Sequence, residues 1–268
     1  MTSKKRLDIL LVEHGLAETR QKAQALILAG QVQVDGKLSD KSGVKISEES
    51  TLSIHNKNLP YVSRGGLKLE AALDHFQVNI SGLSCLDVGA STGGFTDCLL
   101  QRGAHSVVCV DVGYGQLHWK IRNDPRVTVL ERTNIRYLAD NSFSIAFDIA
   151  VIDVSFISLK IVIPKVFSFI RQSGHMIALI KPQFEVGKGE VGKGGVVRNP
   201  EQHDKVLKDL SCFFKNHGLV LHGILPSPIL GPKGNKEFLA YLSPFPYKTG
   251  GNVADIILAL FNALLTSS

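Results

Sequence analysis

The sequence has little of what stabilises secreted or membrane proteins. Four cysteines in 268 residues, none in a CxxC pair, are too few for a disulfide framework and indicate reduced thiols. No signal-peptide core follows the N-terminus, because Asp8 and Glu13 interrupt the apolar run. The longest apolar stretch, within 253–265, is far shorter than the roughly 20 residues that cross a bilayer. We therefore expect a soluble, cytoplasmic protein with no membrane partner.

Metal-ligating patterns and an extreme charge are missing too. The nine histidines form no HxxxH or HxH pair, so no metal site is expected. Thirty Lys and Arg against 24 Asp and Glu give a net charge of +6, a mild lean that many metabolic enzymes share. Charge alone therefore leaves a polyanionic partner open. With 44% hydrophobic and 20% charged residues, the chain has the composition of an ordinary globular protein.

The first part of the chain is predicted to be a separate small α+β domain, residues 1–58. Apolar residues at helical spacing predict helices over 6–14 and 19–30, each ended by a glycine. Alternating valines at 32–34, a tight-turn Asp-Gly dipeptide and an apolar segment at 51–54 predict a small hairpin sheet. Two helices and such a sheet make a compact module.

The rest of the chain, residues 63–268 after a linker at 59–62, alternates short apolar strands with helices. This alternation is typical of βαβ units and predicts an α/β, Rossmann-like fold with a mainly parallel sheet covered on both faces. The apolar run 253–265 is expected to be a packing helix or an oligomer contact, which leaves the oligomeric state open. The expected strands are 84–88, 106–111, 127–130, 149–153, 176–180, 219–225 and 237–242, and the expected helices are 67–76, 93–102, 117–122, 159–170 and 199–216.

A glycine-rich loop follows the first of these strands and opens a helix. It reads DVGASTGGF over 87–95, an acidic residue followed by G-x-x-x-G-G, which is typical of the first loop of Rossmann-like enzymes that bind S-adenosylmethionine. Glycines there let the backbone turn tightly and a ligand approach closely. The next strand ends at Asp111, near the spacing of about 20 residues at which a carboxylate meets a ribose hydroxyl. An ordinary strand-to-helix turn is the alternative. The expected cofactor-binding residues are Asp87, Gly89, Ala90, Ser91, Thr92, Gly93, Gly94, Phe95, Asp111, Val112, Asn134 and Asp153.

Two other glycine-rich stretches compete for a phosphate or cofactor. Residues 113–118 imitate a dinucleotide loop but lack its third glycine, so they more simply line the same pocket. Residues 187–194 come within one residue of a P-loop, but Gly194 stands where Ser or Thr must reach the magnesium ion. We interpret this stretch as a mobile basic flap rather than an ATP site.

Four charged residues stand where charge is unusual. Asp153 and Lys181 each end an apolar strand, and an open parallel sheet binds its ligands outside the carboxyl ends of its strands. Lys68 lies on the helix that enters this domain, and Glu237 begins a late apolar strand. Such a set suits methyl transfer to a hydroxyl, because a partly desolvated lysine beside another cation can remove the hydroxyl proton while carboxylates orient it. Four unrelated surface charges are the alternative.

Four motifs together resemble one family. They are SRGGLKL at 63–69, DVGASTGGFT at 87–96, DVSFIS at 153–158 and IKPQFE at 180–185. In them the chain resembles the TlyA/haemolysin A family of FtsJ-like ribose 2′-O-methyltransferases, which carry an N-terminal RNA-binding module of the ribosomal-protein S-four type. The resemblance implies that S-adenosylmethionine is used to methylate a cytidine ribose in ribosomal RNA or ribosomal subunits. It implies a catalytic tetrad of Lys68, Asp153, Lys181 and Glu237, with Lys181 central to the hydroxyl.

The resemblance also implies phosphate contacts from basic residues, for each of which a solvated helix face is the alternative. Tyr114 and Phe156 are both candidate neighbours of a ligand base, although packing in the core is the simpler expectation for Phe156. Two other functions stay open: an RNA-binding assembly factor with little catalysis, and a pore-forming haemolysin, which the missing signal and spanning segment disfavour. The candidate RNA contacts are Arg6, Arg20, Lys22, Arg64, Lys188 and Lys193.

Overall fold

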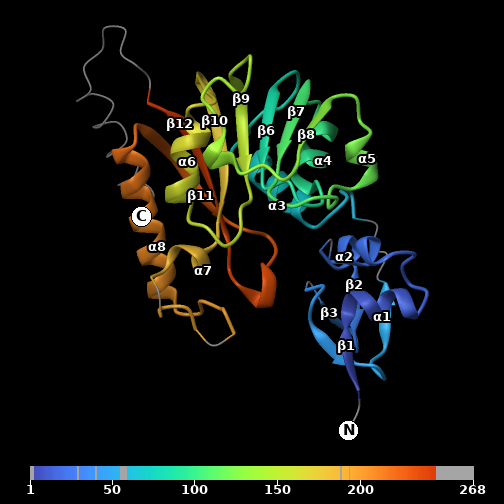
Figure 1. Cartoon of the computed structure of the whole chain (residues 1–268). Coiled ribbons are helices and arrows are strands. Elements are labelled where there is room, and N and C mark those ends of the chain that lie inside the picture. Colours follow the sequence, from blue (N-terminus) through green and yellow to red (C-terminus); the bar gives the residue numbers. More distant parts are fainter. Residues whose placement is uncertain are drawn as a thin grey trace, which may run out of the picture.

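The chain forms a small N-terminal module and a larger α/β body, as Figure 1 shows in a computed structural model. The structure describes residues 3–28, 30–39, 41–54, 59–187, 189–192 and 194–245. The apolar segment 253–265, expected as a packing helix or an oligomer contact, lies outside the described residues.

The small module packs two helices on short antiparallel strands. Its core is made by Leu7 and Leu11 of the first helix, Ala23 and Ile27 of the second, and Val32 of the sheet. A pairing of the first and fourth strands was not predicted, because each is only three residues long and carries polar side chains. The elements are β1 (Lys4–Arg6), α1 (Leu7–Glu13), α2 (Arg20–Leu28), β2 (Val32–Val34), β3 (Lys37–Leu38), β4 (Lys45–Ser47) and β5 (Leu52–Ile54).

The larger body is built on a seven-stranded sheet in the order β11-β12-β10-β9-β6-β7-β8. The described pairings are parallel from β10 through β8, and β12 runs antiparallel to both of its neighbours. The predicted Rossmann-like, mainly parallel sheet is thus confirmed. The strands are β6 (Ser84–Val88), β7 (Ser106–Val110), β8 (Val127–Leu130), β9 (Phe147–Ile152), β10 (Ile170–Ile180), β11 (Leu219–Pro226) and β12 (Phe238–Pro244).

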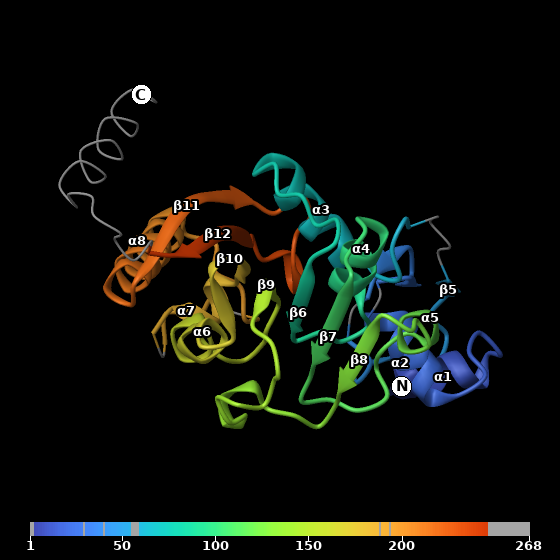
Figure 2. The same ribbon diagram turned by 90° about the horizontal axis from the view of Figure 1, so that it is seen from above.

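Helices cover both faces of this sheet (Figure 2). Side chains alternate along β10, so that Ile177 packs with the core under α3 and α4, while Met176 and Ala178 pack with the core under α6 and α8. The helices are α3 (Gly65–His75), α4 (Gly94–Gln101), α5 (Trp119–Arg122), α6 (Leu159–Phe167), α7 (Pro182–Glu185) and α8 (Pro200–Asn216), with 3₁₀ turns η1 (Ile135–Tyr137) and η2 (Pro232–Gly234).

The predicted boundaries that differ most from the structure are the end of one helix and the start of the strand that follows it. The helix expected over 159–170 ends at Phe167, and Ile170 already pairs with Phe147 as the first residue of β10. The strand was missed over its first half because residues 171–173 are polar and exposed, so the apolar run that marked it begins only at Met176.

The order of the strands in the sheet determines where a ligand can bind. The chain leaves β6 toward β7 on one side, while β9 pairs on the other side, so the connections that follow β6 and β9 diverge. A crevice outside the carboxyl ends of the strands is the usual ligand position at such a switch point.

Candidate active site

The loop after β6 turns sharply at three residues with positive φ: Gly89 at +85°, Ser91 at +48° and Gly93 at +90°. Gly89 also passes close to the end of β9, where a Cβ at this position would lie 2.5 Å from the carbonyl oxygen of Asp153. Only glycine satisfies both demands, since a left-handed backbone is costly for other residues and the space is filled by backbone. The loop after β6 therefore packs closely against Asp153, the residue that follows β9.

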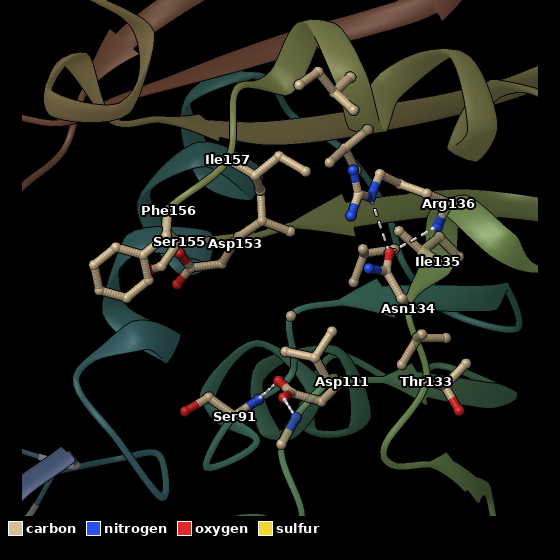
Figure 3. A pocket seen from close by; sticks show the side chains of 18 of the residues that line it. Ser91, Asp111, Thr133, Asn134, Ile135, Arg136, Asp153, Ser155, Phe156 and Ile157 are labelled. Atoms are coloured by element: carbon tan, nitrogen blue, oxygen red, sulfur yellow. Dashed lines mark hydrogen bonds between the residues drawn. The ribbon is translucent and has the colours of Figure 1, made fainter. Parts of the chain in front are cut away.

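Asp111, directly after β7, ties this loop to the next one (Figure 3). Its Oδ2 accepts from the backbone N–H of Ser91 over 2.8 Å, and its Oδ1 accepts from the N–H of Gly113 over 2.6 Å. Two backbone donors hold the carboxylate in one orientation at the carboxyl edge of the sheet. A carboxylate so fixed can still accept from ligand hydroxyls, since each oxygen has a second lone pair.

A cavity of about 990 Å³ opens beside these loops. Ser91 and Asp111 lie on one side of it, Asn134 after β8 on another, and Asp153 at the end of β9 (Figure 3). The Asn134 Oδ1 accepts from the backbone N–H and the Nε of Arg136, which fixes its amide on the wall. Six of the predicted cofactor residues line this cavity: Gly89, Ser91, Asp111, Val112, Asn134 and Asp153.

A second cavity of about 190 Å³ adjoins the first. The structure brings the four predicted catalytic residues together on its wall. Asp153 and Ser155, which lie in the segment that follows β9, line both cavities. The two cavities therefore meet at this segment. The predicted cofactor-binding and catalytic residues on the smaller cavity are Lys68, Gly89, Ala90, Ser91, Thr92, Gly94, Phe95, Asp153, Lys181 and Glu237.

The tetrad consists of two ion pairs. Lys68 Nζ lies 2.6 Å from Glu237 Oε2, and Lys181 Nζ lies 2.6 Å from Asp153 Oδ1. Both lysines are only 8% exposed and Glu237 is 1% exposed. Each buried charge therefore has a counter-charge, which offsets the loss of hydration. Lys181 Nζ also donates to the Ser155 hydroxyl over 2.9 Å.

The electrostatics of the site keep Asp153 ionised. Burial raises the pKa of this carboxyl, but the charges of Lys181 and Lys68 and the hydrogen bond from Lys181 together outweigh burial, so the pKa lies below its usual value. Glu237 Oε1 is buried with no hydrogen-bond partner among the described residues. An unpartnered buried oxygen is unfavourable by itself and indicates a site shaped for a further donor.

Two predicted cofactor residues, Asp87 and Gly93, are not among the described residues that line either cavity. Asp87 is fully buried behind the loop, where the Thr96 hydroxyl donates to its Oδ2 over 2.6 Å. Burial raises the pKa of Asp87 to about 7, against the hydrogen bond from Thr96 and helped by the negative charges of Asp153 and Asp111. Asp87 thus contacts the first turn of α4 through Thr96.

Sequence reasoning missed the turn that follows Asp153. Phe156, expected in the core, is 91% exposed on the wall of the larger cavity, and a φ of +65° turns it there. Its ring lies 5.1 Å from that of Phe184. Glu185 holds the far end of the turn, because its oxygens accept from the Ser158 hydroxyl over 2.6 Å and from the Leu159 N–H over 2.8 Å. The motif DVSFIS contained these residues, but apolar character alone wrongly indicated burial for Phe156.

The predicted RNA-contacting cations are dispersed. Arg64 lines the smaller cavity and donates to the Leu230 carbonyl over 3.4 Å. Arg6 and Arg20 both contact Asp8 in the small module, and Lys22 pairs with Glu18 on its surface. The flap lysines Lys188 and Lys193 lie outside the described residues.

The described part of the chain lacks two further classes of feature. Among those residues no group of three or more His, Cys, Asp or Glu side chains is arranged to hold a metal ion. No described helix combines the length and the apolar character needed to cross a membrane.

Comparison with known proteins identifies the family to which the chain belongs. Residues 61–243 match the model of the FtsJ-like methyltransferases, and residues 5–52 match the S4 domain. The chain belongs to the FtsJ-like methyltransferase family. The matched range contains the whole tetrad and all the residues that line the two cavities except Leu28 and Gly30 of the small module, so the tetrad belongs to a methyltransferase domain.

Three similar proteins extend over nearly the whole chain. YqxC of Bacillus subtilis is 50% identical, over 90% of this chain and 87% of that protein. The 16S/23S rRNA (cytidine-2′-O)-methyltransferase TlyA of Mycobacterium tuberculosis is 44% identical, over 90% of this chain and 91% of that protein. A solved structure of a hemolysin-named protein from Streptococcus thermophilus is 43% identical, with a TM-score of 0.71 over 91% of this chain and 90% of that one.

Proposed function

We propose that this methyltransferase moves the methyl group of S-adenosylmethionine to the 2′-hydroxyl of a cytidine ribose in ribosomal RNA. The observation that carries the proposal is the meeting of two cavities at Asp153 and Ser155, with two buried lysine–carboxylate pairs on the smaller one. One cavity is large enough for a nucleoside cofactor, and the other suits a single sugar hydroxyl. Ribosomal RNA as substrate would place the protein in the cytoplasm.

The residues of the larger cavity fit S-adenosylmethionine. The oriented carboxylate of Asp111 suits the ribose hydroxyls of the cofactor, and Asn134 stands where the edge of its adenine would reach. Gly89 and Ser91 of the positive-φ loop line both cavities, which supports contact of this loop with the remainder of the cofactor. When bound, S-adenosylmethionine supplies an electrophilic methyl group.

The smaller cavity would hold the hydroxyl that is methylated. Lys181 is fixed by Asp153 and Ser155, so its ammonium is aimed rather than free to rotate. Contact with this cation stabilises the negative charge that grows on the hydroxyl oxygen as this oxygen bonds to the methyl carbon and the carbon–sulfur bond breaks. The ionised carboxylate of Asp153, on the same wall, would accept the hydroxyl proton. Lys68 and Glu237 place a second pair beside the first and keep the local charge near zero.

Substrate contacts outside the tetrad follow from exposure and charge. An exposed aromatic ring on the wall of a nucleotide site suits stacking on a base, which supports Phe156 as a contact for the target nucleotide. Arg64 at the mouth of the smaller cavity suits a backbone phosphate. The S4 domain match and the names of relatives such as TlyA support RNA, and ribosomal RNA in particular.

We further propose domain boundaries of 1–58 and 63–268, joined by the linker 59–62. The linker is bound to the methyltransferase body at three points. The Pro60 carbonyl accepts from Gln101 Nε2 and the Val62 N–H donates to Asp97 Oδ2, both over 2.8 Å, and the Tyr61 hydroxyl donates to Glu70 Oε1 over 2.7 Å. Two of these bonds tie the linker to α4, the helix that the cofactor loop opens, and the third ties it to α3.

The test is to map ribose methylation on ribosomal subunits incubated with S-adenosylmethionine and the protein, by mass spectrometry of nuclease fragments. We expect one or a few cytidines to gain a methyl group, and Lys181→Ala to lower the rate about 10²–10⁴-fold while cofactor affinity stays within a factor of about two. Lys205→Ala, which removes an exposed lysine paired with Glu190, is the matched control and should leave the rate unchanged. Unchanged methylation at every site would overturn the proposed reaction and favour an assembly factor.

A further inference from the structure

Asp8 is a fully buried carboxylate in the small module, on the first turn of α1. Three side chains donate to it. Arg6 binds it with two nitrogens, Nε to Oδ1 over 2.9 Å and Nη2 to Oδ2 over 2.8 Å. Arg20 Nε and Gln24 Nε2, both from α2, donate to Oδ2 over 3.0 and 2.8 Å. One acid group therefore joins two arginines that are far apart in the sequence.

The carboxylate stays ionised at this buried position. The hydrogen bond from Arg6 lowers its pKa most, burial opposes it, and the bonds from Gln24 and Arg20 lower it further, so the pKa lies below its usual range. Two guanidinium groups that meet at the same Oδ2 atom would repel each other without this charge. Asp8 is thus what permits the two cations to stand side by side.

Both arginines remain open to solvent on their other sides. The Arg6 side chain is 37% exposed and the Arg20 side chain is 54% exposed, against 0% for Asp8. The group carries two positive charges and one negative charge, and the negative charge is the one that is covered. Opposite Arg6 on the neighbouring strand, Lys45 adds a further exposed cation. The surface that faces outward is consequently cationic and held in a fixed geometry.

We propose that Asp8 is a positioning residue that holds Arg6 and Arg20 as a two-armed clamp for a phosphate of the RNA backbone. The inference rests on the proposed function for its choice of RNA as the partner. Planar guanidinium groups bind phosphate oxygens through paired N–H donors, and affinity gains when those donors are oriented before binding. A buried anion that lowers the net charge of the module then increases its affinity for a polyanion.

The charge of Asp8 and its orienting effect on the two arginines act on RNA affinity in opposite directions, so a substitution at this position distinguishes them. In the full-length chain, Asp8→Asn keeps the size of the side chain and adds one positive charge to the module. We expect it to weaken binding to purified ribosomal RNA about 3–10-fold in a filter-binding assay, since lost orientation outweighs the gained charge. Glu18→Gln is the matched control: it also removes one negative charge from the module, but from an exposed residue that contacts Lys22. Its RNA affinity should equal or exceed that of the wild type.

A double-mutant cycle shows whether Asp8 acts through the arginines. In a chain that already carries Arg6→Ala and Arg20→Ala, Asp8→Asn should have no further weakening effect on RNA binding. Gln24→Ala, which removes a neutral hydrogen bond to Asp8 without changing the charge, should weaken binding in the same direction. This variant also serves if thermal unfolding shows that Asp8→Asn does not fold.

The outcomes separate the inference from the function on which it rests. Wild-type protein that fails to bind ribosomal RNA would overturn the proposed function and this inference with it. Wild-type binding that survives Arg6→Ala with Arg20→Ala would overturn the clamp alone. Asp8→Asn or, if that variant is unfolded, Gln24→Ala that binds as tightly as the wild type would also overturn the clamp.

Discussion

Lys181 and Ser155 are joined by a hydrogen bond of 2.9 Å from Nζ to Oγ, across the ends of two neighbouring strands. Asp153 Oδ1 forms an ion pair with the same ammonium, at 2.6 Å. The hydrogen bond to Ser155 and the ion pair with Asp153 together restrain the position of this ammonium. Ser155 thereby becomes a residue that aims Lys181, at the junction of the two cavities.

Ser155→Ala should therefore slow methyl transfer without loosening the cofactor. Losing one hydrogen bond to a charged group is worth about 1.5–3 kcal/mol, so we expect a decrease in kcat of roughly 10-fold or more. Radiolabelled methyl transfer to ribosomal RNA measures kcat, and calorimetric titration measures the affinity for S-adenosylmethionine, which should stay constant. Ser155→Thr, which keeps the hydroxyl, should restore part of the rate. An unchanged kcat for Ser155→Ala would show that Asp153 alone orients Lys181.

The Lys68–Glu237 pair should respond differently to single and double substitution. Glu237→Gln leaves the buried ammonium of Lys68 without its counter-charge and should lower the free energy of unfolding by about 3–5 kcal/mol. Adding Lys68→Met should recover much of that stability, because the remaining charge is then removed as well. Neither variant should methylate RNA at the wild-type rate. Urea unfolding measures the stabilities, and a double variant less stable than the single one would contradict this account.

Two glycines with similar backbone angles provide a matched comparison. A Cβ on Gly89 would meet the Asp153 carbonyl oxygen at 2.5 Å, whereas nothing lies within 4 Å of one on Gly82, whose φ is +77°. Gly82→Ala should lower the free energy of unfolding by about 1–2 kcal/mol from backbone strain alone. Gly89→Ala should lower it by about 1–3 kcal/mol more and also weaken binding of S-adenosylmethionine. Equal effects of the two substitutions on stability would show that the loop adjusts freely.

Asp87 should make stability depend on pH near neutrality. Burial raises its pKa from an ordinary 3.8 to about 7 in the folded protein. Between these two values the folded state binds more protons than the unfolded state, so the free energy of unfolding should fall as the pH rises from about 4 to 7. Asp87→Asn, which keeps an oxygen to accept from Thr96, should flatten this slope and be a few kcal/mol more stable at pH 8. Thermal unfolding across this pH range gives the slope, and the same slope in both proteins would refute the assignment.

Much of the fold could be predicted because its main elements are locally determined. Strands β6 and β8 begin and end where predicted, because each is a short run rich in apolar and β-branched residues. Helix α8 begins where Asn199-Pro200 predicts, with Asn199 Oδ1 accepting from the N–H of Glu201. In these places the residue types alone select the backbone conformation.

Elements that depend on distant partners were missed. The pairing of β1 with β4 and the first half of β10 have no local apolar pattern. The first depends on a strand about 40 residues away, and β10 begins at Ile170 because this residue pairs with Phe147 of β9. Phe156 was wrongly predicted to lie in the core because its side chain is apolar. Its apolar ring is held outside by a left-handed backbone and by a turn that Glu185 fixes from another element.

The amino-acid sequence alone was enough to indicate a methyltransferase loop, a Rossmann-like sheet and four unusually placed charges. Which of these four charged residues form ion pairs was decided by the tertiary structure. Lys68 and Glu237 are 169 positions apart and meet because α3 packs on the sheet and β12 inserts next to β10. The same holds for Asp8, whose neighbours come from β1 and α2. A side chain's type follows from the sequence, but the charge that it faces depends on which elements the folded core brings together, because electrostatic attraction acts only over short distances in water.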